Sequence, residues 1–348
     1  MCLTCFRKPK LFLLLLLPWF IESHLRSEEG GLSAYQLGMH YLSQHKPDLA
    51  EKSFLQALRD PAAPVETHFQ LAWVYTSMGD WKKAETAILQ FIEKRPGSSE
   101  AQYILGYSLF RQNHYAEAVQ PLRKALTNMQ SNAEGHKILG LCYFQLGEKK
   151  EAEVELKRAV ELDPQSKEAT YFLGRLYYTV NRFAEAQLAF ENAIRLDSHY
   201  IKAYDNLGLT FDGLGLSQKA VEAFQKAIQL SEQMKVDSKW PHLNLGEALL
   251  KQNQYSESIK YFQQAVVIDP NWAKAHACLG KALLREGKKE EAKSRFLTAI
   301  RLDPGSSDAH YQLGQLYRKE GNLQAAEREL KIFQELKQKS STSNLSAP

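Results

Sequence analysis

The chain has 348 residues, more than the roughly 100–200 of a typical domain, so it forms either two or more domains or one extended array. Hydrophobic residues make up 44% and charged residues 24%, which excludes low-complexity disorder and collagen-like repeats for the bulk of the chain. The net charge of +4, from 44 Lys and Arg against 40 Asp and Glu, is too balanced to indicate nucleic acid as a partner. Four cysteines do not make a disulfide scaffold.

The N-terminal segment has the pattern of a targeting signal. Arg7, Lys8 and Lys10 precede an apolar run over residues 11–21. A helix needs about 20 apolar residues to span a membrane, so this run is short for a span and fits a secretory signal peptide better. The cleavage motif around Ser23 and Ser27 is poor, so an uncleaved anchor stays open as an alternative, as does a wrongly assigned start codon. We assign residues 1–26 to a signal peptide or N-terminal membrane anchor, and expect an exported (periplasmic or extracytoplasmic) or membrane-tethered protein.

A period of 34 residues organises the chain after residue 30. The dipeptide Leu-Gly, with Leu-Ala in one copy, recurs at this interval throughout, except for one interval of 38 residues. The dipeptides begin at Leu37, Leu71, Leu105, Leu139, Leu173, Leu207, Leu245, Leu279 and Leu313. Nine repeats therefore fill residues 31–338, with starts near residues 31, 65, 99, 133, 167, 201, 239, 273 and 307.

Each repeat carries further residues at fixed offsets. A small residue such as Ala220 follows the leucine by thirteen positions, a bulky apolar residue such as Phe224 comes four later, and alanine such as Ala227 comes three after that. This pattern resembles the tetratricopeptide repeat (TPR), over about nine-tenths of the chain. The resemblance implies an all-α fold, a right-handed α-solenoid (superhelix) of about nine TPR helix-turn-helix repeats. One such hairpin cannot bury its apolar face alone, whereas stacked neighbours can.

Turn residues and exceptions complete the pattern. Gly or Asn separates the two expected helices of nearly every repeat, as at Gly79 and Asn113, and both residues tolerate the left-handed conformation that ends a helix. Four extra residues lie near 231–238, and we expect them to lengthen the second helix of the sixth repeat or the loop after it. The polar residues 339–348 are predicted to form a disordered tail.

The sequence does not indicate a catalytic or metal site. One repeat position carries five histidines: His68, His136, His242, His276 and His310. Neighbouring helices stack about 8–10 Å apart, whereas each nitrogen ligand must lie within about 2.1 Å of a zinc ion. Histidines on successive repeats are therefore too far apart to share a metal ion, and we expect these rings to pack between helices. Cys142 and Cys278 lie four repeats apart, too far for a disulfide. No phosphate loop, His-Glu-x-x-His motif or nucleophile elbow occurs, so we expect no enzyme activity, no metal and no cofactor.

The resemblance implies that the first helix of each repeat lines a concave groove in which ligands bind. Repeat positions 2, 5, 9 and 12 give the candidate partner-binding residues Tyr35, Phe69, Trp73, Tyr103, Tyr107, Phe110, Phe144, Tyr171 and Tyr178. The last four repeats mostly present charged or polar residues there: Lys202, Asp205, Asp212, Glu247, Lys274, Lys281, Asp308, Gln315 and Arg318. Partly exposed rings offer large contact area at low side-chain entropy cost. The alternative is that individual rings pack between neighbouring repeats.

Comparison with known TPR binding modes excludes some classes of partner. A carboxylate clamp needs Lys followed by Asn four residues later, but Lys137 is followed by Leu141, so capture of an acidic C-terminal tail is disfavoured. We expect a non-catalytic scaffold that binds an extended or helical protein segment in the groove, similar to bacterial envelope TPR proteins. Alternatives are an envelope assembly factor or co-chaperone, an accessory subunit presenting substrate to a separate glycosyl- or peptidoglycan-modifying enzyme, and a glycan-binding solenoid. We expect a protein or peptide partner, no nucleic acid, and membrane contact only through an uncleaved N-terminal segment, with the oligomeric state open.

Overall fold

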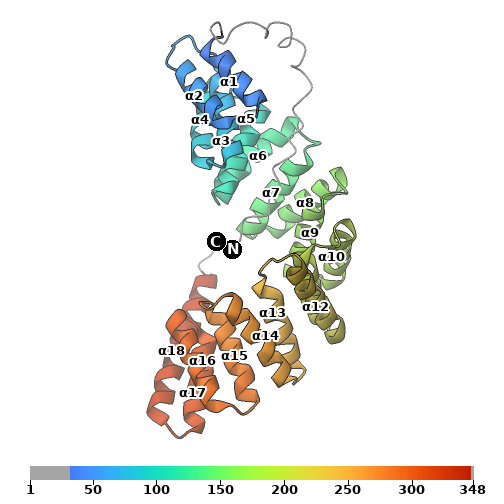
Figure 1. Cartoon of the computed structure of the whole chain (residues 1–348), viewed down its shortest axis with the longest axis vertical. Coiled ribbons are helices and arrows are strands. Elements are labelled where there is room, and N and C mark those ends of the chain that lie inside the picture. Colours follow the sequence, from blue (N-terminus) through green and yellow to red (C-terminus); the bar gives the residue numbers. More distant parts are fainter. Residues whose placement is uncertain (1–31, 346–348) are drawn as a thin grey trace. The chain divides into compact units, whose positions relative to one another are not determined.

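The computed structural model describes residues 32–345, and within this range the chain forms 18 helices and no strands (Figure 1). The helices fall into two compact units, the first ending at Pro164 and the second beginning at Gln165. The predicted targeting segment, residues 1–26, lies outside the described residues. Between residues 32 and 345 no helix is long and apolar enough to cross a membrane.

The first unit contains four helix pairs. They are α1 (Ala34–Ser43) with α2 (Pro47–Ala57), α3 (Glu66–Met78) with α4 (Trp81–Lys94), α5 (Ser99–Arg111) with α6 (Tyr115–Asn128), and α7 (Ala133–Leu146) with α8 (Lys149–Leu162).

The second unit contains five pairs. They are α9 (Lys167–Thr179) with α10 (Phe183–Leu196), α11 (Ile201–Gly213) with α12 (Ser217–Gln233), α13 (Lys239–Lys251) with α14 (Tyr255–Ile268), α15 (Ala273–Arg285) with α16 (Lys289–Leu302), and α17 (Ser307–Lys319) with α18 (Leu323–Leu345).

Each unit is an α-solenoid of helix-turn-helix repeats, as the sequence predicts. Within a unit every helix packs against the next helix along the chain, as α13 does against α14 and α14 against α15. First helices of neighbouring repeats also touch, as α3 and α5 do in the first unit and α11 and α13 in the second. From the third repeat onward, each first helix begins at the residue that the 34-residue period marks as a repeat start. The right-handed sense of the superhelix stays a prediction.

The predicted turn residues adopt the left-handed conformation. Positive φ angles occur at Gly79, Asn113, Gly147, Asn181, Gly215, Asn253, Gly287 and Gly321. Asn113, with φ of 64°, shows that asparagine takes this role where glycine is absent. In the first repeat His45 does so, with φ of 57°. These residues reverse the chain between the two helices of a repeat, which brings both apolar faces together.

The small residue of the Leu-Gly pair allows the two helices of a repeat to approach closely. In the seventh repeat, a Cβ atom at Gly246 would lie 2.6 Å from Cε1 of Phe262. That distance is too short for two carbon atoms, so only glycine leaves room for this ring. Phe262 is fully buried and belongs to a core cluster that also includes Leu279 and Phe296. The pairing of a glycine with a large residue on the second helix therefore fixes the spacing within the repeat.

Two second helices depart from the repeat. Helix α12 has 17 residues, against 14 in α10 and α14, so the extra residues lengthen this helix and the loop after it, as predicted. Helix α18 has 23 residues and continues through Leu345, into the polar segment 339–348 for which the sequence predicts a disordered tail. Serine and threonine lower helix propensity only by a few tenths of a kcal/mol each, and residues 323–347 contain no proline.

Candidate functional site

The nine candidate rings all lie on first helices, but the two units divide them. Those of the first unit are Tyr35 on α1, Phe69 and Trp73 on α3, Tyr103, Tyr107 and Phe110 on α5, and Phe144 on α7. The second unit holds Tyr171 and Tyr178, both on α9. Since α3 contacts α5 and α5 contacts α7, the rings of these three helices lie on neighbouring elements of one unit.

Three of the rings are buried, in contrast to the partly exposed rings that the sequence suggested. Tyr103, Tyr107 and Tyr171 are 6%, 9% and 5% exposed. Tyr103 and Tyr107 stack with parallel planes and a centroid distance of 6.2 Å. Trp81 of α4 packs edge-on against Tyr107, at 5.5 Å between centroids. These tyrosines therefore pack within the repeat stack, which was the alternative for individual rings.

Arg111 fixes this cluster further. Its Nη1 donates a hydrogen bond to the hydroxyl oxygen of Tyr107 at 2.9 Å, and its guanidinium lies 4.1 Å from the centroid of the Trp81 ring. Burial raises the pKa of the Tyr103 hydroxyl well above its ordinary value, so this group stays neutral. The cluster is a structural joint between the second and third repeats.

Five half-buried rings form what we call the aromatic face of the first unit: Tyr35, Phe69, Trp73, Phe110 and Phe144. Three of these rings, Tyr35, Phe69 and Phe110, pack against an aromatic ring on the second helix of their own repeat. Phe69 lies 5.2 Å from Phe91, and Phe110 lies 5.9 Å from Tyr115, between ring centroids. Tyr35, Phe69 and Phe110 are therefore anchored on one side and partly open to solvent on the other, and Trp73 and Phe144 are also partly open to solvent.

Polar pairs join neighbouring first helices in the second unit. The ion pairs run between Asp212 and Lys251 at 2.5 Å, Glu247 and Lys274 at 3.3 Å, and Lys281 and Asp308 at 2.5 Å. Hydrogen bonds run from Asn206 to the hydroxyl of Tyr171 at 3.2 Å and from Asn244 to Asp205 at 2.8 Å. Many of the charged residues that the sequence placed on this face therefore contact one another and hold the repeats together.

Asp205 is a buried carboxyl group among these pairs. It is 8% exposed, and burial raises the pKa of its carboxyl group to about 7, although the hydrogen bond donated by Asn244 opposes this shift. Its charge therefore changes near neutral pH at a joint between α11 and α13.

Two exposed aromatic residues on first helices were missed by the sequence analysis. Trp240, at repeat position 2 of α13, is 50% exposed, and Tyr311, at position 5 of α17, is 39% exposed. The sequence does contain a signal for Trp240. The same position carries lysine in both adjacent repeats, which indicates that a side chain at this position is exposed. The generally charged character of the last four repeats obscured it.

Histidines at the shared repeat position bond to groups of their own repeat and of the repeat before it. The Nε2 atoms of His276 and His310 lie 3.0 and 3.2 Å from the carbonyl oxygens of Pro270 and Pro304, at the end of the preceding repeat. The Nδ1 atoms of His136 and His310 lie 2.6 Å from carboxylate oxygens of Glu155 and Glu329 on the following helix. Within residues 32–345, no group of three or more His, Cys, Asp or Glu side chains could hold a metal ion. The bonded rings therefore pack between helices, as expected.

The two cysteines of the repeats are separate buried thiols. Cys142 lies in the first unit and Cys278 in the second, and both are free. Burial raises the pKa of each thiol to about 12. Neither thiol is therefore in the reactive thiolate form near neutral pH.

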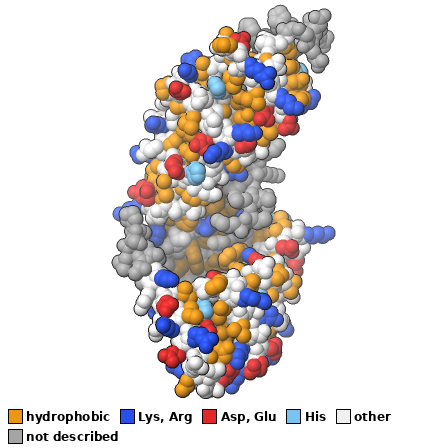
Figure 2. Space-filling model, turned by 90° about the vertical axis from the view of Figure 1, so that its left-hand side faces the viewer, with side chains coloured by type: hydrophobic (Ala, Val, Ile, Leu, Met, Phe, Trp, Pro, Cys, Tyr) orange, Lys and Arg blue, Asp and Glu red, His pale blue; other side chains and the backbone are white. Residues whose placement is uncertain are grey.

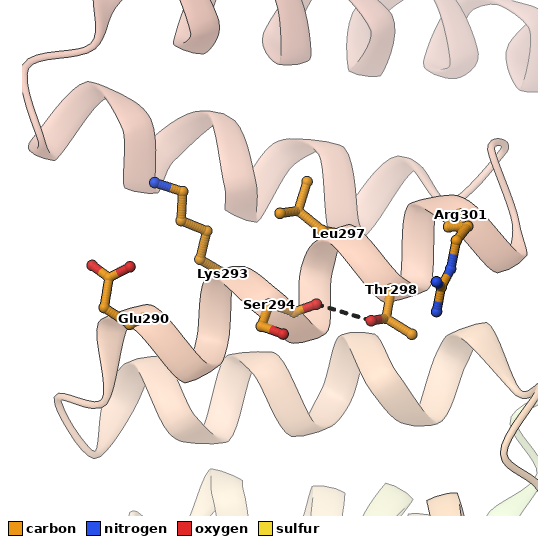
Figure 3. A pocket seen from close by; sticks show the side chains of 6 residues that line it. All are labelled: Glu290, Lys293, Ser294, Leu297, Thr298 and Arg301. Atoms are coloured by element: carbon orange, nitrogen blue, oxygen red, sulfur yellow. Dashed lines mark hydrogen bonds between the residues drawn. The ribbon is translucent and has the colours of Figure 1, made fainter.

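One shallow, open depression follows α16 and is lined by Glu290, Lys293, Ser294, Leu297, Thr298 and Arg301 (Figure 3). All these side chains come from one helix, and Lys293 is paired with Glu320 at 3.1 Å. On the face that Figure 2 shows, charged side chains of both signs are interspersed with apolar ones.

Three family models match the sequence. They are "Anaphase-promoting complex, cyclosome, subunit 3" over residues 77–159, "TPR repeat" over 246–287, and "Tetratricopeptide repeat" over 171–235 and 279–339. No curated protein matches the chain.

Several solved structures share the fold. Pseudomonas aeruginosa PilF is 24% identical, covers 64% of this chain and 97% of its own, and has a TM-score of 0.53. A tetratricopeptide repeat protein from Parabacteroides merdae is 18% identical, covers 72% of this chain and 98% of its own, and has a TM-score of 0.58. The Cut9-Hcn1 hetero-tetramer of APC/C is 17% identical, covers 78% of this chain and 52% of its own, with a TM-score of 0.58. At these identities the likeness shows the fold alone.

Proposed function

Because the chain is a tetratricopeptide repeat protein, we propose that it is a non-catalytic scaffold that binds an extended or helical segment of a partner protein. The observation that carries this proposal is the aromatic face of the first unit. Rings that are anchored on one side and open on the other give a partner a large apolar contact at little cost in side-chain entropy.

Trp73 is the expected centre of this surface. It lies on α3 four residues after Phe69, so both side chains lie on one side of the helix, and α5 with Phe110 is the adjacent first helix. Tryptophan is the residue that most often dominates interface energies. The partner segment therefore carries apolar side chains that cover Trp73 and its neighbours.

The test is affinity capture with and without the accessible rings. The bait is the chain from residue 27 onward, and the variant carries Trp73→Ala, Phe110→Ala and Phe144→Ala, leaving the buried Tyr107 intact. We expect the parent to retain a native partner that the variant loses, with affinity at least about tenfold weaker in a titration with that partner. The same proteins on both baits would contradict the aromatic face as the site.

A matched control removes apolar area elsewhere. Leu188 and Val267 are 67% and 71% exposed on second helices, so Leu188→Ala with Val267→Ala takes away exposed apolar surface outside the aromatic face. Capture should be unchanged in this variant. Equal far-UV circular dichroism of all three baits shows that the fold is retained.

We further propose that residues 1–26 export the chain or tether it to a membrane. The support is the basic segment before the apolar run of residues 11–21. Fractionation with N-terminal sequencing should find either a chain shortened by its first 22–27 residues outside the cytoplasm, or an intact chain in the membrane fraction. An intact chain in the soluble cytoplasmic fraction contradicts the proposal.

A further inference from the structure

Trp240 is an exposed ring held in a fixed position. It lies in the first turn of α13, is 50% exposed, and packs edge-on against Trp272, with 4.7 Å between centroids and 71° between planes. Lys239 and Lys274 flank the pair, with Nζ atoms 4.6 Å from the Trp272 centroid and 5.9 Å from the Trp240 centroid. Exposing so large an apolar ring is unfavourable in water, so a surface that holds it in place favours an apolar contact.

Lysines occupy the equivalent position on both neighbouring first helices. Lys202 of α11, Trp240 of α13 and Lys274 of α15 all stand at repeat position 2. The hydrogen bond between Asp205 and Asn244 joins α11 to α13 about one turn further along both helices, so the first turns that carry Lys202 and Trp240 are adjacent. The Lys274 side chain approaches Trp240 directly, as the distance above shows.

The two lysines differ in whether their ammonium groups are already paired with a carboxylate of the protein. Lys202 is exposed and takes part in no ion pair within residues 32–345. Lys274 is 3.3 Å from Glu247, but half of its side-chain surface remains accessible. A ligand carboxylate would therefore find one free ammonium group and one that it shares with Glu247.

The extra residues of the sixth repeat add apolar surface before Trp240. Met234 and Val236, each 48% exposed, lie in the loop between α12 and α13. The loop is closed by a hydrogen bond from the Val236 amide to the Ser231 carbonyl at 2.9 Å. The insertion thus presents two apolar side chains within six residues of Trp240 in the chain.

We propose that Lys202, Trp240 and Lys274 form a second binding site, the Lys-Trp-Lys site, for an acidic peptide segment of a protein partner. An apolar side chain of the peptide covers Trp240, and carboxylates on both sides of it pair with Lys202 and Lys274. Neighbouring first helices lie about 8–10 Å apart, and a peptide in the polyproline II conformation rises about 3.1 Å per residue with three residues per turn, so every third side chain faces the same way. The matching peptide therefore has glutamate or aspartate about three residues before and three residues after its apolar residue.

This site rests on the proposed scaffold function and gives its second unit a partner chemistry of its own. It needs no C-terminal carboxylate, because its lysines stand at position 2 of the repeat. The arrangement is therefore different from the clamp that the sequence disfavours.

The probe is a blocked, fluorescein-labelled peptide with the order Gly-Ser-Glu-Ser-Ser-Phe-Ser-Ser-Glu-Ser-Gly, titrated with the full-length chain at low ionic strength. We expect fluorescence anisotropy to show binding that weakens at least about fivefold when glutamine replaces both glutamates. Trp240→Ala should weaken binding about tenfold or more, and Lys202→Glu several-fold. Lys260→Glu on α14, which makes the same charge change at another exposed site, should leave it unchanged.

A charge exchange tests the pairing itself. The Lys202→Glu, Lys274→Glu variant should prefer a peptide with lysine in place of both glutamates. Equal binding of the glutamate and glutamine peptides overturns the proposal, and so does unchanged binding by a Trp240→Ala variant with intact circular dichroism.

The aromatic face supplies the contrast that separates the two proposals. Trp73→Ala with Phe110→Ala should bind the acidic peptide like the parent. Loss of peptide binding in that variant overturns the Lys-Trp-Lys site and places the peptide on the aromatic face. If the aromatic-face variant captures the same partner as the parent and still binds the acidic peptide, only the proposed function of the aromatic face is contradicted, and the Lys-Trp-Lys site stands.

Discussion

Replacing Phe262 by alanine is expected to lower the free energy of unfolding of the second unit by about 3–5 kcal/mol. The ring is fully buried, faces Gly246 across the helix pair, and contributes to the core shared by the seventh and eighth repeats. Because glycine offers no side chain that could move into the space, the cavity stays open. Guanidinium denaturation gives the total loss, and native-state hydrogen exchange should show that α13 and α14 lose protection first.

Val267→Ala serves as a control for this prediction, and Gly246→Ala tests the contact between residues 246 and 262. Val267→Ala, on the exposed side of the same helix α14, should change stability by no more than about 0.5 kcal/mol. Gly246→Ala should destabilise the parent, because the new methyl group meets the Phe262 ring. In the Phe262→Ala background it should instead stabilise by up to about 1 kcal/mol through helix propensity. Additive effects of the two substitutions would contradict the close contact.

Replacing Asp205 by asparagine is expected to remove a pH dependence of stability and to stabilise the protein in alkaline solution. The folded-state pKa of about 7 lies above the ordinary value of 3.8, so the folded state holds a proton that the unfolded state releases. The contribution of this carboxyl group is complete below about pH 4 and is lost as the pH rises through 7, with a slope of up to about 1.4 kcal/mol per pH unit. The asparagine side chain introduced by Asp205→Asn would keep an oxygen acceptor for the Asn244 amide.

Denaturation of parent and variant between pH 4 and 9 checks this expectation. The difference should grow with pH and reach on the order of 2–4 kcal/mol above pH 8 in favour of Asp205→Asn. Asp237→Asn, in the exposed loop before α13, should run parallel to the parent at every pH. A difference that shrinks as the pH rises would contradict the burial of an uncharged Asp205.

The regular part of the fold follows from the sequence because each repeat solves the same local problem. The period locates the helices, and the Gly or Asn between them supplies the left-handed turn residue. The division at Pro164 could not be read in this way, because the 34-residue period continues across it without change. The division depends on how closely each repeat packs against the next one. The residues at fixed offsets that define a repeat do not specify this packing.

The candidate site was only partly accessible to sequence reasoning for a related reason. Position 9 predicts that Trp73 and Tyr107 lie on the equivalent faces of α3 and α5, but their exposure depends on which side chains the adjacent helix packs against them. Trp81 covers Tyr107, whereas Trp73 remains partly open. Trp240 shows the opposite case, a single aromatic residue at a position that is otherwise charged in neighbouring repeats.

The pairing of Gly246 with Phe262 has a consequence for how such a chain changes over generations. The same sixteen-residue separation joins Gly38 to Phe54, Gly140 to Leu156 and Gly280 to Phe296, and each pair lies within one repeat. A duplication or deletion of 34 residues therefore leaves each of these glycines with a large residue sixteen positions later, wherever its endpoints fall. The array can be lengthened or shortened in whole units, whereas a change of any other length between the two partners would separate a glycine from the ring or leucine that it accommodates.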